Sequence, residues 1–376
     1  MFWSLRIAPK PTPINRGITP ASLSFCRPLT RPDISRFFLD MQATLKDVAE
    51  HAGVSIATVS RVLNEPEKVA EQSRIKVLNA IDELGYSSNL LAKSLRKDGL
   101  NAVFVLLPSL SDPFFAQINQ GISDVLASYG YLMLTVATEG MHNLEEEYLL
   151  KAKSMGLAGV LIYTAHRRMP SSWEAFCANF PILFLSNTDP LGVPNAEQLL
   201  IPWGELGSQI ASYLLKQGRR RFLYLANDIS GFSPDFLAGL QSTVQQAGGL
   251  CGHCRADASL DDAARELNRY CRQSGETPDA VITQNCFQGA GVLLSLAGQE
   301  LHVPQDVAVL CLENSRLAQL PTPQLSVWGP SGYQVGVVGS RRLLDLIRAG
   351  TGETLPPLGD EIGLTLIARG STDAAE

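Results

Sequence analysis

Residues 44–64, TLKDVAEHAGVSIATVSRVLN, decide how the rest of the chain is interpreted, because they predict two short helices joined by a tight turn. Thr44 can cap the first helix, and Asp47 stands three residues later, as in a capping box. Gly53 follows where the chain must turn sharply, and Ser55 can cap a second helix. Small residues at the crossing let the two helices approach closely, which favours a helix-turn-helix.

The second predicted helix has two contrasting faces. Val59 and Val62 stand three residues apart and should point inward. Short side chains near the N-terminus of the outward face, followed by the guanidinium of Arg61, suit an element that enters a DNA major groove. The outward residues are Ile56, Ala57, Ser60, Arg61 and Asn64. The alternative is an ordinary helical hairpin in which Arg61 is only a solvated charge.

The same run resembles the signature of the LacI family of bacterial transcription regulators, D-V-A-x-x-A-G-V-S-x-x-T-V-S-R-V-L-N, and the similarity continues more loosely to the C-terminus. The resemblance implies a homodimer that binds a palindromic operator in double-stranded DNA, most simply as a repressor. It implies that Arg61 contacts guanine, that Ile56 and Ala57 select neighbouring bases, and that other polar side chains position phosphates. The predicted DNA-binding residues are Thr44, Ser55, Ile56, Ala57, Thr58, Ser60, Arg61, Asn64, Asn89, Ala92, Lys93 and Leu95.

Residues 65–86 predict a third helix that packs across the first two. Its apolar positions Ile75, Leu78, Ile81 and Leu84 recur every three residues, and this stripe is expected to face inward. The helix-turn-helix head is therefore expected to span residues 41–86.

Residues 87–99 come next, and Asn89 can cap a helix too short to be stable alone. In the LacI family this segment is a hinge helix that folds when two copies meet over the minor groove. The resemblance places Leu95 as an apolar wedge between base pairs. The alternative is a flexible linker with incidental leucines.

The first 40 residues contain six prolines and scattered arginines without sustained periodicity. They weakly resemble a transit peptide but lack the apolar core of a secretory signal. We expect translation to begin at Met41, immediately before the family's usual start, or else a disordered tail.

Composition and charge describe a soluble globular protein of several cores. Its 376 residues are 45% hydrophobic and 18% charged, and no apolar run of about 18 residues predicts a membrane span. Seven irregularly spaced cysteines favour a reducing cytoplasm, where the protein would associate with the nucleoid. Net charge is +4 over residues 1–40, zero over 41–99 and −10 over the remainder. DNA affinity must therefore come from the placement of a few cations and not from overall attraction.

From Ala102 onward, apolar strands alternate with helical stretches, and the alternation restarts after residue 202. This pattern predicts a two-lobed α/β effector domain over residues 100–376, with doubly wound parallel sheets and a ligand in the cleft at their carboxyl ends. It resembles the periplasmic-binding-protein-like domain of the family. On that resemblance lobe 1 comprises about 101–201 and 329–357, and lobe 2 comprises about 202–328 and 358–376.

The effector pocket is predicted from the resemblance, position by position. Its members are Phe114, Phe115, Ser186, Phe236, Asn285, Glu313 and Trp328. An ordinary core role for Phe115 remains an alternative. Phe236 replaces a usual arginine, Glu313 a usual aspartate, and Ala258 an aromatic residue that often occurs there. These departures put a simple hexose in doubt, so the effector class stays open among sugars, sugar acids and nucleosides.

Cys251–Gly252–His253–Cys254 matches the redox motif of disulfide isomerases, but it follows a predicted helix instead of opening one. We therefore expect loop residues and no metal site. No catalytic constellation stands out, so the chain is expected to be no enzyme and to use no cofactor. The rival interpretations are a transcriptional activator, a regulator that has lost its sugar effector, a periplasmic sugar-binding protein and, remotely, a thiol oxidoreductase.

Overall fold

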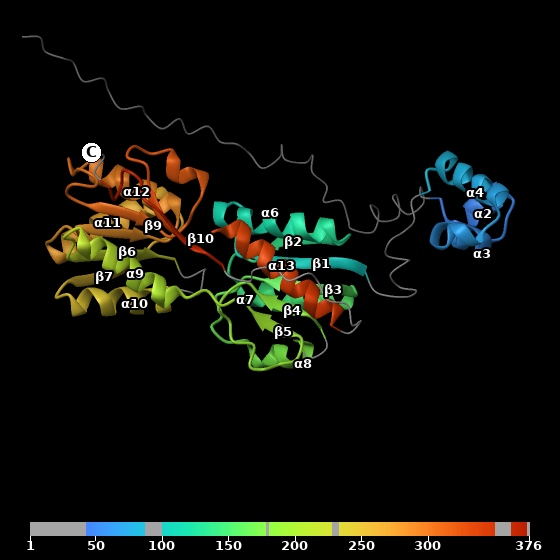
Figure 1. Ribbon diagram of the computed structural model, residues 1–376, viewed down its shortest axis with the longest axis horizontal. Coiled ribbons are helices and arrows are strands. Elements are labelled where there is room, and N and C mark those ends of the chain that lie inside the picture. Colours follow the sequence, from blue (N-terminus) through green and yellow to red (C-terminus); the bar gives the residue numbers. More distant parts are fainter. Residues whose placement is uncertain (1–42, 87–99, 178–179, 228–232, 350–361, 374–376) are drawn as a thin grey trace, which may run out of the picture. The chain divides into compact units, whose positions relative to one another are not determined.

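The computed structural model describes residues 43–86, 100–177, 180–227, 233–349 and 362–373, which fall into two compact units divided after Asn89 (Figure 1). We call residues 43–86 the head and residues 100–373 the α/β domain. The predictions for residues 1–40 and for the hinge residues Asn89, Ala92, Lys93 and Leu95 lie outside the described residues.

The head consists of helices α2 (Leu45–Ala52), α3 (Ile56–Asn64) and α4 (Glu71–Glu83), with a short 3-10 turn at Pro66–Lys68. The predicted capping box is confirmed, because the Thr44 hydroxyl accepts from the backbone of Asp47 while the Asp47 carboxylate accepts from the backbone and hydroxyl of Thr44. These hydrogen bonds to the charged form lower the pKa of Asp47. Gly53 ends α2 in the left-handed conformation, with φ of 64°, and turns the chain towards α3.

Packing of α4 corrects one prediction. Val77 and Ala80 are the residues that α4 buries against Val48, Val59 and their neighbours. Ile75 and Leu78 instead leave about half of their side chains exposed, at 48% and 49%. A spacing of three drifts around a helix of 3.6 residues per turn, so only the later part of the predicted stripe, Ile81 and Leu84, packs against the core.

The α/β domain begins with a five-stranded parallel sheet in the order β2-β1-β3-β4-β5. Helices α6 and α13 pack together on one face of this sheet, and α7 and α8 cover the other (Figure 1). The elements are β1 (Leu100–Leu107), α6 (Pro113–Ser128), β2 (Leu132–Ala137), α7 (His142–Ser154), β3 (Leu157–Ile162), α8 (Glu174–Cys177), β4 (Ile182–Phe184), β5 (Ala196–Gln198) and α13 (Gly332–Arg348).

A second sheet of six strands has the order β11-β10-β9-β8-β6-β7, and only its β10–β11 pair is antiparallel. Helices α9 and α10 cover one face, and α11 and α12 cover the other. The elements are α9 (Trp203–Lys216), β6 (Arg221–Ala226), α10 (Ser233–Gln246), β7 (Leu250–Arg255), α11 (Leu260–Ser274), β8 (Ala280–Thr283), α12 (Cys286–Ala297), β9 (Ala308–Cys311), β10 (Ser326–Pro330) and β11 (Leu364–Ile367).

Strand β1 shows why each sheet needs two layers of helices. Val103 and Val105 pack towards α6 and α13, while Phe104 and Leu106 between them pack towards α7 and α8. Successive side chains of a strand point to opposite faces, so a continuous apolar run requires cover on both. The predicted fold class, a helical head followed by a doubly wound α/β domain, is thus confirmed.

Two details differ from the sequence-based expectations. Cys251–Cys254 lie on the edge strand β7, which pairs with β6 from Arg221 to Ala226, and not in a loop. Strand β10 keeps Gly329 and Pro330 in the second sheet, so these two residues do not belong with the first sheet as the predicted boundary had them. The helix that returns to the first sheet begins at Gly332.

Candidate functional site

The head presents one face of α3 to solvent. Ser55 caps the helix by accepting from the backbone of Thr58 at 3.1 Å, and Val59 and Val62 anchor the opposite face in the core. Ile56, with 49% of its side chain exposed, and Arg61 lie on the open side. The rigid inner face thus fixes the direction in which the outer residues point.

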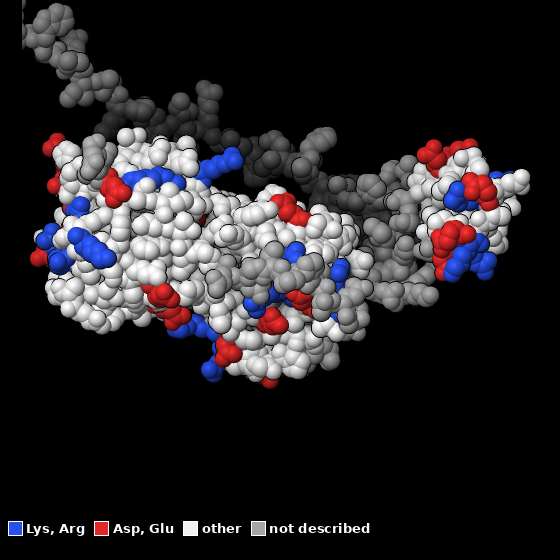
Figure 2. Space-filling view, viewed as in Figure 1, with Lys and Arg blue, Asp and Glu red and all other residues white. Residues whose placement is uncertain are grey.

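The exposed face of α3 combines a cationic side chain with apolar ones, which suits a polyanion that also carries apolar groups. Among the described residues no acidic side chain pairs with the guanidinium of Arg61, and Ala57 beside it is exposed. Acidic and basic side chains both gather on the head (Figure 2), so its attraction to DNA depends on which cations lie nearest the groove.

The other predicted contacts differ in how available they are. Thr58 and Ser60 are half-buried beside the exposed face. The hydroxyl of Thr44 is committed to the cap of α2, and the hydroxyl of Ser55 to the cap of α3, where it also lies 2.9 Å from the Thr58 hydroxyl. Asn64 is the last residue of α3.

In the α/β domain a cavity with about 390 Å³ of empty space, part of it continuous with solvent, opens where strands of both sheets end. Its lining comes from the segments that follow β1, β6, β8 and β9 and from the start of α9. The carboxyl ends of parallel strands are where ligands bind in open α/β sheets. The lining residues are Asp112, Phe114, Phe115, Trp203, Asn227, Gln284, Asn285, Leu312 and Glu313.

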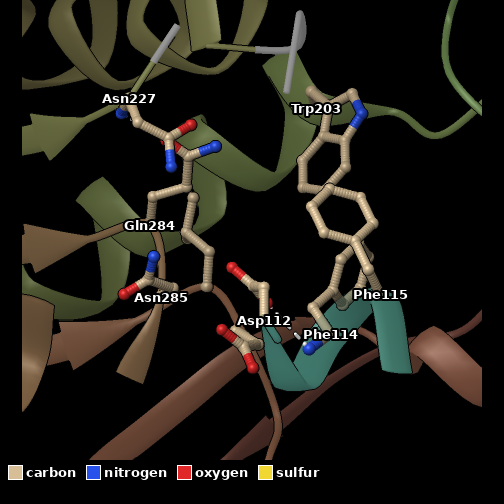
Figure 3. A pocket seen from close by; sticks show the side chains of 9 residues that line it. Asp112, Phe114, Phe115, Trp203, Asn227, Gln284 and Asn285 are labelled. Carbon is tan, nitrogen blue, oxygen red and sulfur yellow. Dashed lines mark hydrogen bonds between the residues drawn. The ribbon is translucent and has the colours of Figure 1, made fainter. Parts of the chain in front are cut away.

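The cavity has an aromatic side and an amide side. Phe115 and Trp203 lie together along one wall, and Asn227, Gln284 and Asn285 lie along the opposite wall (Figure 3). Asp112 caps α6 by accepting from the backbone of Phe114 at 2.9 Å, and Asn285 caps α12 by accepting from the backbone of Gln288, also at 2.9 Å. The N-termini of α6 and α12 therefore position the side chains of Asp112 and Asn285.

Two carboxyl groups face each other in this cavity without a basic residue among its lining. Burial, reinforced by the neighbouring Asp112, raises the pKa of Glu313 well above its usual value of 4.5, and burial also raises the pKa of Asp112. The Oε1 atom of Glu313 and the Nδ2 atom of Asn285 are buried without a hydrogen-bond partner. Buried polar atoms of this kind are costly unless a ligand or water satisfies them.

The cavity brings together four of the seven predicted pocket residues, namely Phe114, Phe115, Asn285 and Glu313. The other three lie elsewhere. Ser186 is buried 3.0 Å from the Thr188 hydroxyl. Phe236 is fully buried with its ring 4.9 Å from that of Tyr224.

Trp328 packs edge-on against Tyr213 and lines a separate, open hollow along α9. The sequence analysis did not single out Trp203 or Asn227. Each had a signal: Trp203 comes directly after the predicted boundary between the lobes, and Asn227 follows β6 as Gln284 follows β8.

The two thiols of the C-G-H-C motif do not form a reactive pair. Cys251 and Cys254 are both free cysteines, three positions apart on β7. Burial raises the pKa of Cys251 to about 12 and also raises that of Cys254. Redox catalysis needs the thiolate, so these surroundings oppose it.

A third cluster escaped the sequence analysis, which predicted no metal ligands. His142, Glu145 and His166 place one ligand atom each within 4.8 Å of one another. The first two are three residues apart on α7, a spacing that puts side chains on one helix face, but His166 is distant in sequence.

Comparison with known proteins finds a family match in each of the two units. Residues 44–89 match the model of bacterial regulatory proteins of the lacI family, and residues 211–372 match the periplasmic binding protein-like domain. The chain is 28% identical to the ribose operon repressor of Bacillus subtilis (strain 168) over 337 residues, which cover 88% of this chain and 98% of that protein.

Two solved structures share the fold. The complex of the transcriptional regulator CelR with cellobiose aligns with a TM-score of 0.60 at 26% identity, over 88% of this chain and 100% of that one. The lac repressor dimer bound to operator and the anti-inducer ONPF aligns with a TM-score of 0.73 at 23% identity, over 89% and 100%. None of the described helices is long and apolar enough to cross a membrane. The chain therefore carries a helix-turn-helix head of the lacI family and a periplasmic binding protein-like domain, and it is similar to regulators of this type along nearly its whole length.

Proposed function

We propose that this protein represses transcription by binding a palindromic operator as a homodimer, and that a small molecule in the α/β domain controls this binding. The observation that carries the proposal is the exposed face of α3, held outward by a buried valine face, on the same chain as a cavity between two sheets that is lined by aromatic, amide and carboxyl side chains. The protein acts by binding and not by catalysis, in the cytoplasm where the nucleoid lies.

On the DNA, we assign base reading to three residues of α3. Arg61 offers the forked donor that pairs with guanine, while Ile56 and Ala57 offer apolar contact of the kind that thymine methyl groups make. The hydroxyls around them serve phosphate positioning. Thr44 and Ser55 contribute mainly by capping the helices that carry these contacts.

The hinge residues Asn89, Ala92, Lys93 and Leu95 enter the proposal through the family resemblance. Two short hinges would fold together over the minor groove, with Leu95 opening a base step. Such a pair needs two copies of the chain, which supports the homodimer.

The effector we propose is a neutral polyhydroxylated molecule. The described lining of the cavity contains the carboxyl groups of Asp112 and Glu313 and no basic residue, so an acidic ligand would find no cation to pair with. Sugar hydroxyls can pair with the Oε1 atom of Glu313 and the Nδ2 atom of Asn285, which have no partner of their own. The aromatic wall formed by Phe115 and Trp203 suits the apolar face of a sugar ring.

The class of effector is tested by thermal shift of the full chain against matched neutral sugars, nucleosides and sugar acids. A neutral ligand at 100 times its dissociation constant should stabilise the protein by about 2.7 kcal/mol, and its acid counterpart should not. The same ligand should then change the affinity for operator DNA. Stabilisation by sugar acids alone would contradict the assignment.

A further inference from the structure

A cluster of two histidines and one glutamate lies at the carboxyl edge of the first sheet. Helix α7, which follows β2, carries His142 and Glu145, and the segment after β3 carries His166. Strands β2 and β3 both flank β1 in parallel, so their carboxyl ends meet at one edge. The Oε2 atom of Glu145 lies 3.3 Å from Nδ1 of His142 and 3.7 Å from Nε2 of His166.

The glutamate of this cluster lacks a cation. Its side chain has no exposed surface, and within the described part of the chain its Oε1 atom has no hydrogen-bond partner. Among the described residues no lysine or arginine pairs with it. A carboxylate buried in this way is costly unless it is paired. A bound cation would offset that cost.

His166 places a ring nitrogen beside the carboxylate of Glu145. Its Nε2 atom is buried without a hydrogen-bond partner. The two rings lie with their centroids 3.7 Å apart, and Trp173 packs edge-on against His166.

Thr164 supports the arrangement from behind. Its hydroxyl donates to Oε2 of Glu145 at 2.9 Å and accepts from the backbone of His166 at 3.2 Å. One side chain therefore fixes both the carboxylate and the segment that carries a histidine. Supporting hydrogen bonds of this kind orient the ligands of metal sites.

We propose that His142, Glu145 and His166 bind a divalent transition-metal ion of the zinc class. Bonds of about 2.0–2.1 Å in tetrahedral geometry separate ligand atoms by about 3.3 Å, close to both distances measured from Glu145. Imidazole nitrogens suit zinc, nickel and copper and disfavour magnesium and calcium. His142, with 53% of its side chain exposed, has room to adjust and leaves the fourth position open to solvent.

The site is placed to influence the two lobes of the α/β domain. Arg167 follows His166, and its Nη2 atom lies 2.5 Å from Oδ1 of Asp235 at the start of α10, on the second sheet. An ion that holds His166 also holds the segment from which Arg167 reaches across. This consequence rests on the proposed control of DNA binding by a small molecule in the α/β domain, whereas metal binding itself does not.

Metal binding is tested on the full chain without DNA or effector. Protein stripped with a chelator and kept reduced by a phosphine is titrated calorimetrically with zinc chloride. One strong site per chain is expected, weakened at least about tenfold in His142→Gln and in Glu145→Gln. His142 is half exposed, so its variant should fold. His302→Gln, which changes a histidine exposed elsewhere in the domain, should bind zinc as the unmodified protein does.

Cobalt(II) then separates this site from the seven cysteines. Ligation by histidine and glutamate should give visible ligand-field bands without the near-ultraviolet absorption of cobalt thiolate, and the bands should be lost in His142→Gln. Absence of tight zinc binding would overturn the proposal. So would zinc binding that is unchanged in both variants, or that carries the thiolate absorption.

Discussion

Arg61 is the residue on which sequence recognition depends in this account. Its exposed position on α3, opposite the buried Val59 and Val62, leaves the guanidinium free to meet a base edge. Arg61→Ala should cost about 1–3 kcal/mol of operator binding and relax the preference at one position of each half-site. Fluorescence anisotropy on the operator and on its single-base variants measures both effects.

Arg74→Ala is the matched control, because Arg74 is a partly exposed arginine of the same unit that pairs with Glu71 on α4. Its replacement should change operator binding little. If Arg61→Ala weakens binding equally on every sequence, Arg61 contacts phosphate and the assignment of base reading is wrong.

Glu313 makes a prediction about pH. A carboxyl group whose pKa is raised in the folded protein favours folding fully below its usual value of 4.5, and this contribution is lost as pH rises through the raised pKa. The substitution Glu313→Gln removes this loss of stability, because glutamine does not titrate. Its Tm should therefore exceed that of the unmodified protein by roughly 2–4 °C at about pH 8, the shift that about 1 kcal/mol gives, and should match it near pH 4.5.

Glu276→Gln serves as the control, since Glu276 is exposed on the same domain and its replacement should leave the pH profile unchanged. Asp112 and Glu145 share the direction of the pKa shift, so only the difference between variant and unmodified protein isolates Glu313. A Tm increase of equal size at both pH values would indicate a packing effect instead.

At the scale of elements, the crossing of α9 and α10 depends on glycine. A Cβ atom on Gly239 would lie 1.9 Å from the backbone oxygen of Gly204, a distance that only movement of the helices can relieve. Gly239→Ala should destabilise the domain by about 3 kcal/mol, at or beyond the upper end of overpacking costs. Urea unfolding followed by circular dichroism measures the change.

Gly298→Ala is the comparison, because Gly298 has helical backbone angles and its added Cβ would meet only ordinary contacts at 3.5 Å or more. That variant should be neutral or slightly more stable. Equal stability of the two variants would show that α9 and α10 can move apart at little cost.

Elements with a strong local signal could be predicted from the sequence, and those decided by packing could not. The caps of α2 and α3 depend on side chains within three residues, so Thr44 and Ser55 were identified correctly. The inner face of α4 depends on where α2 lies, so Ile75 was wrongly expected inside. Strand β7 has too little apolar character to be recognised, because it pairs at the sheet edge.

The residues proposed for the cavity divide in the same way, into those that the sequence could place and those that it could not. Phe115 stands in the first turn of the helix after β1, and Asn285 and Glu313 come shortly after β8 and β9, so the fold alone brings them to one edge of the sheets. The residue that replaces the usual arginine, Phe236, instead joined the core beside Tyr224, since nothing in local sequence distinguishes a cavity wall from a buried layer. That His166 lies beside His142 could not be predicted without the order of the strands in the sheet.

At the scale of the whole α/β domain, the pair Arg167–Asp235 joins the segment after β3 to α10. Both side chains are partly exposed, so the pair should contribute about 0.2–1 kcal/mol to holding the lobes together. Arg167→Gln should therefore weaken effector binding by no more than about fivefold, as isothermal titration can measure. Arg168→Gln removes a neighbouring pair with Asp189 and should leave effector binding unchanged.

The central claim is that paired copies of this chain read DNA sequence through α3. Selection of bound duplexes from a random-sequence library by the full-length protein, at moderate salt and against nonspecific competitor, tests it most directly. The account predicts an enriched palindrome whose half-sites change when Arg61 is replaced. Recovery of duplexes with no shared sequence by a protein that is dimeric and folded would contradict it.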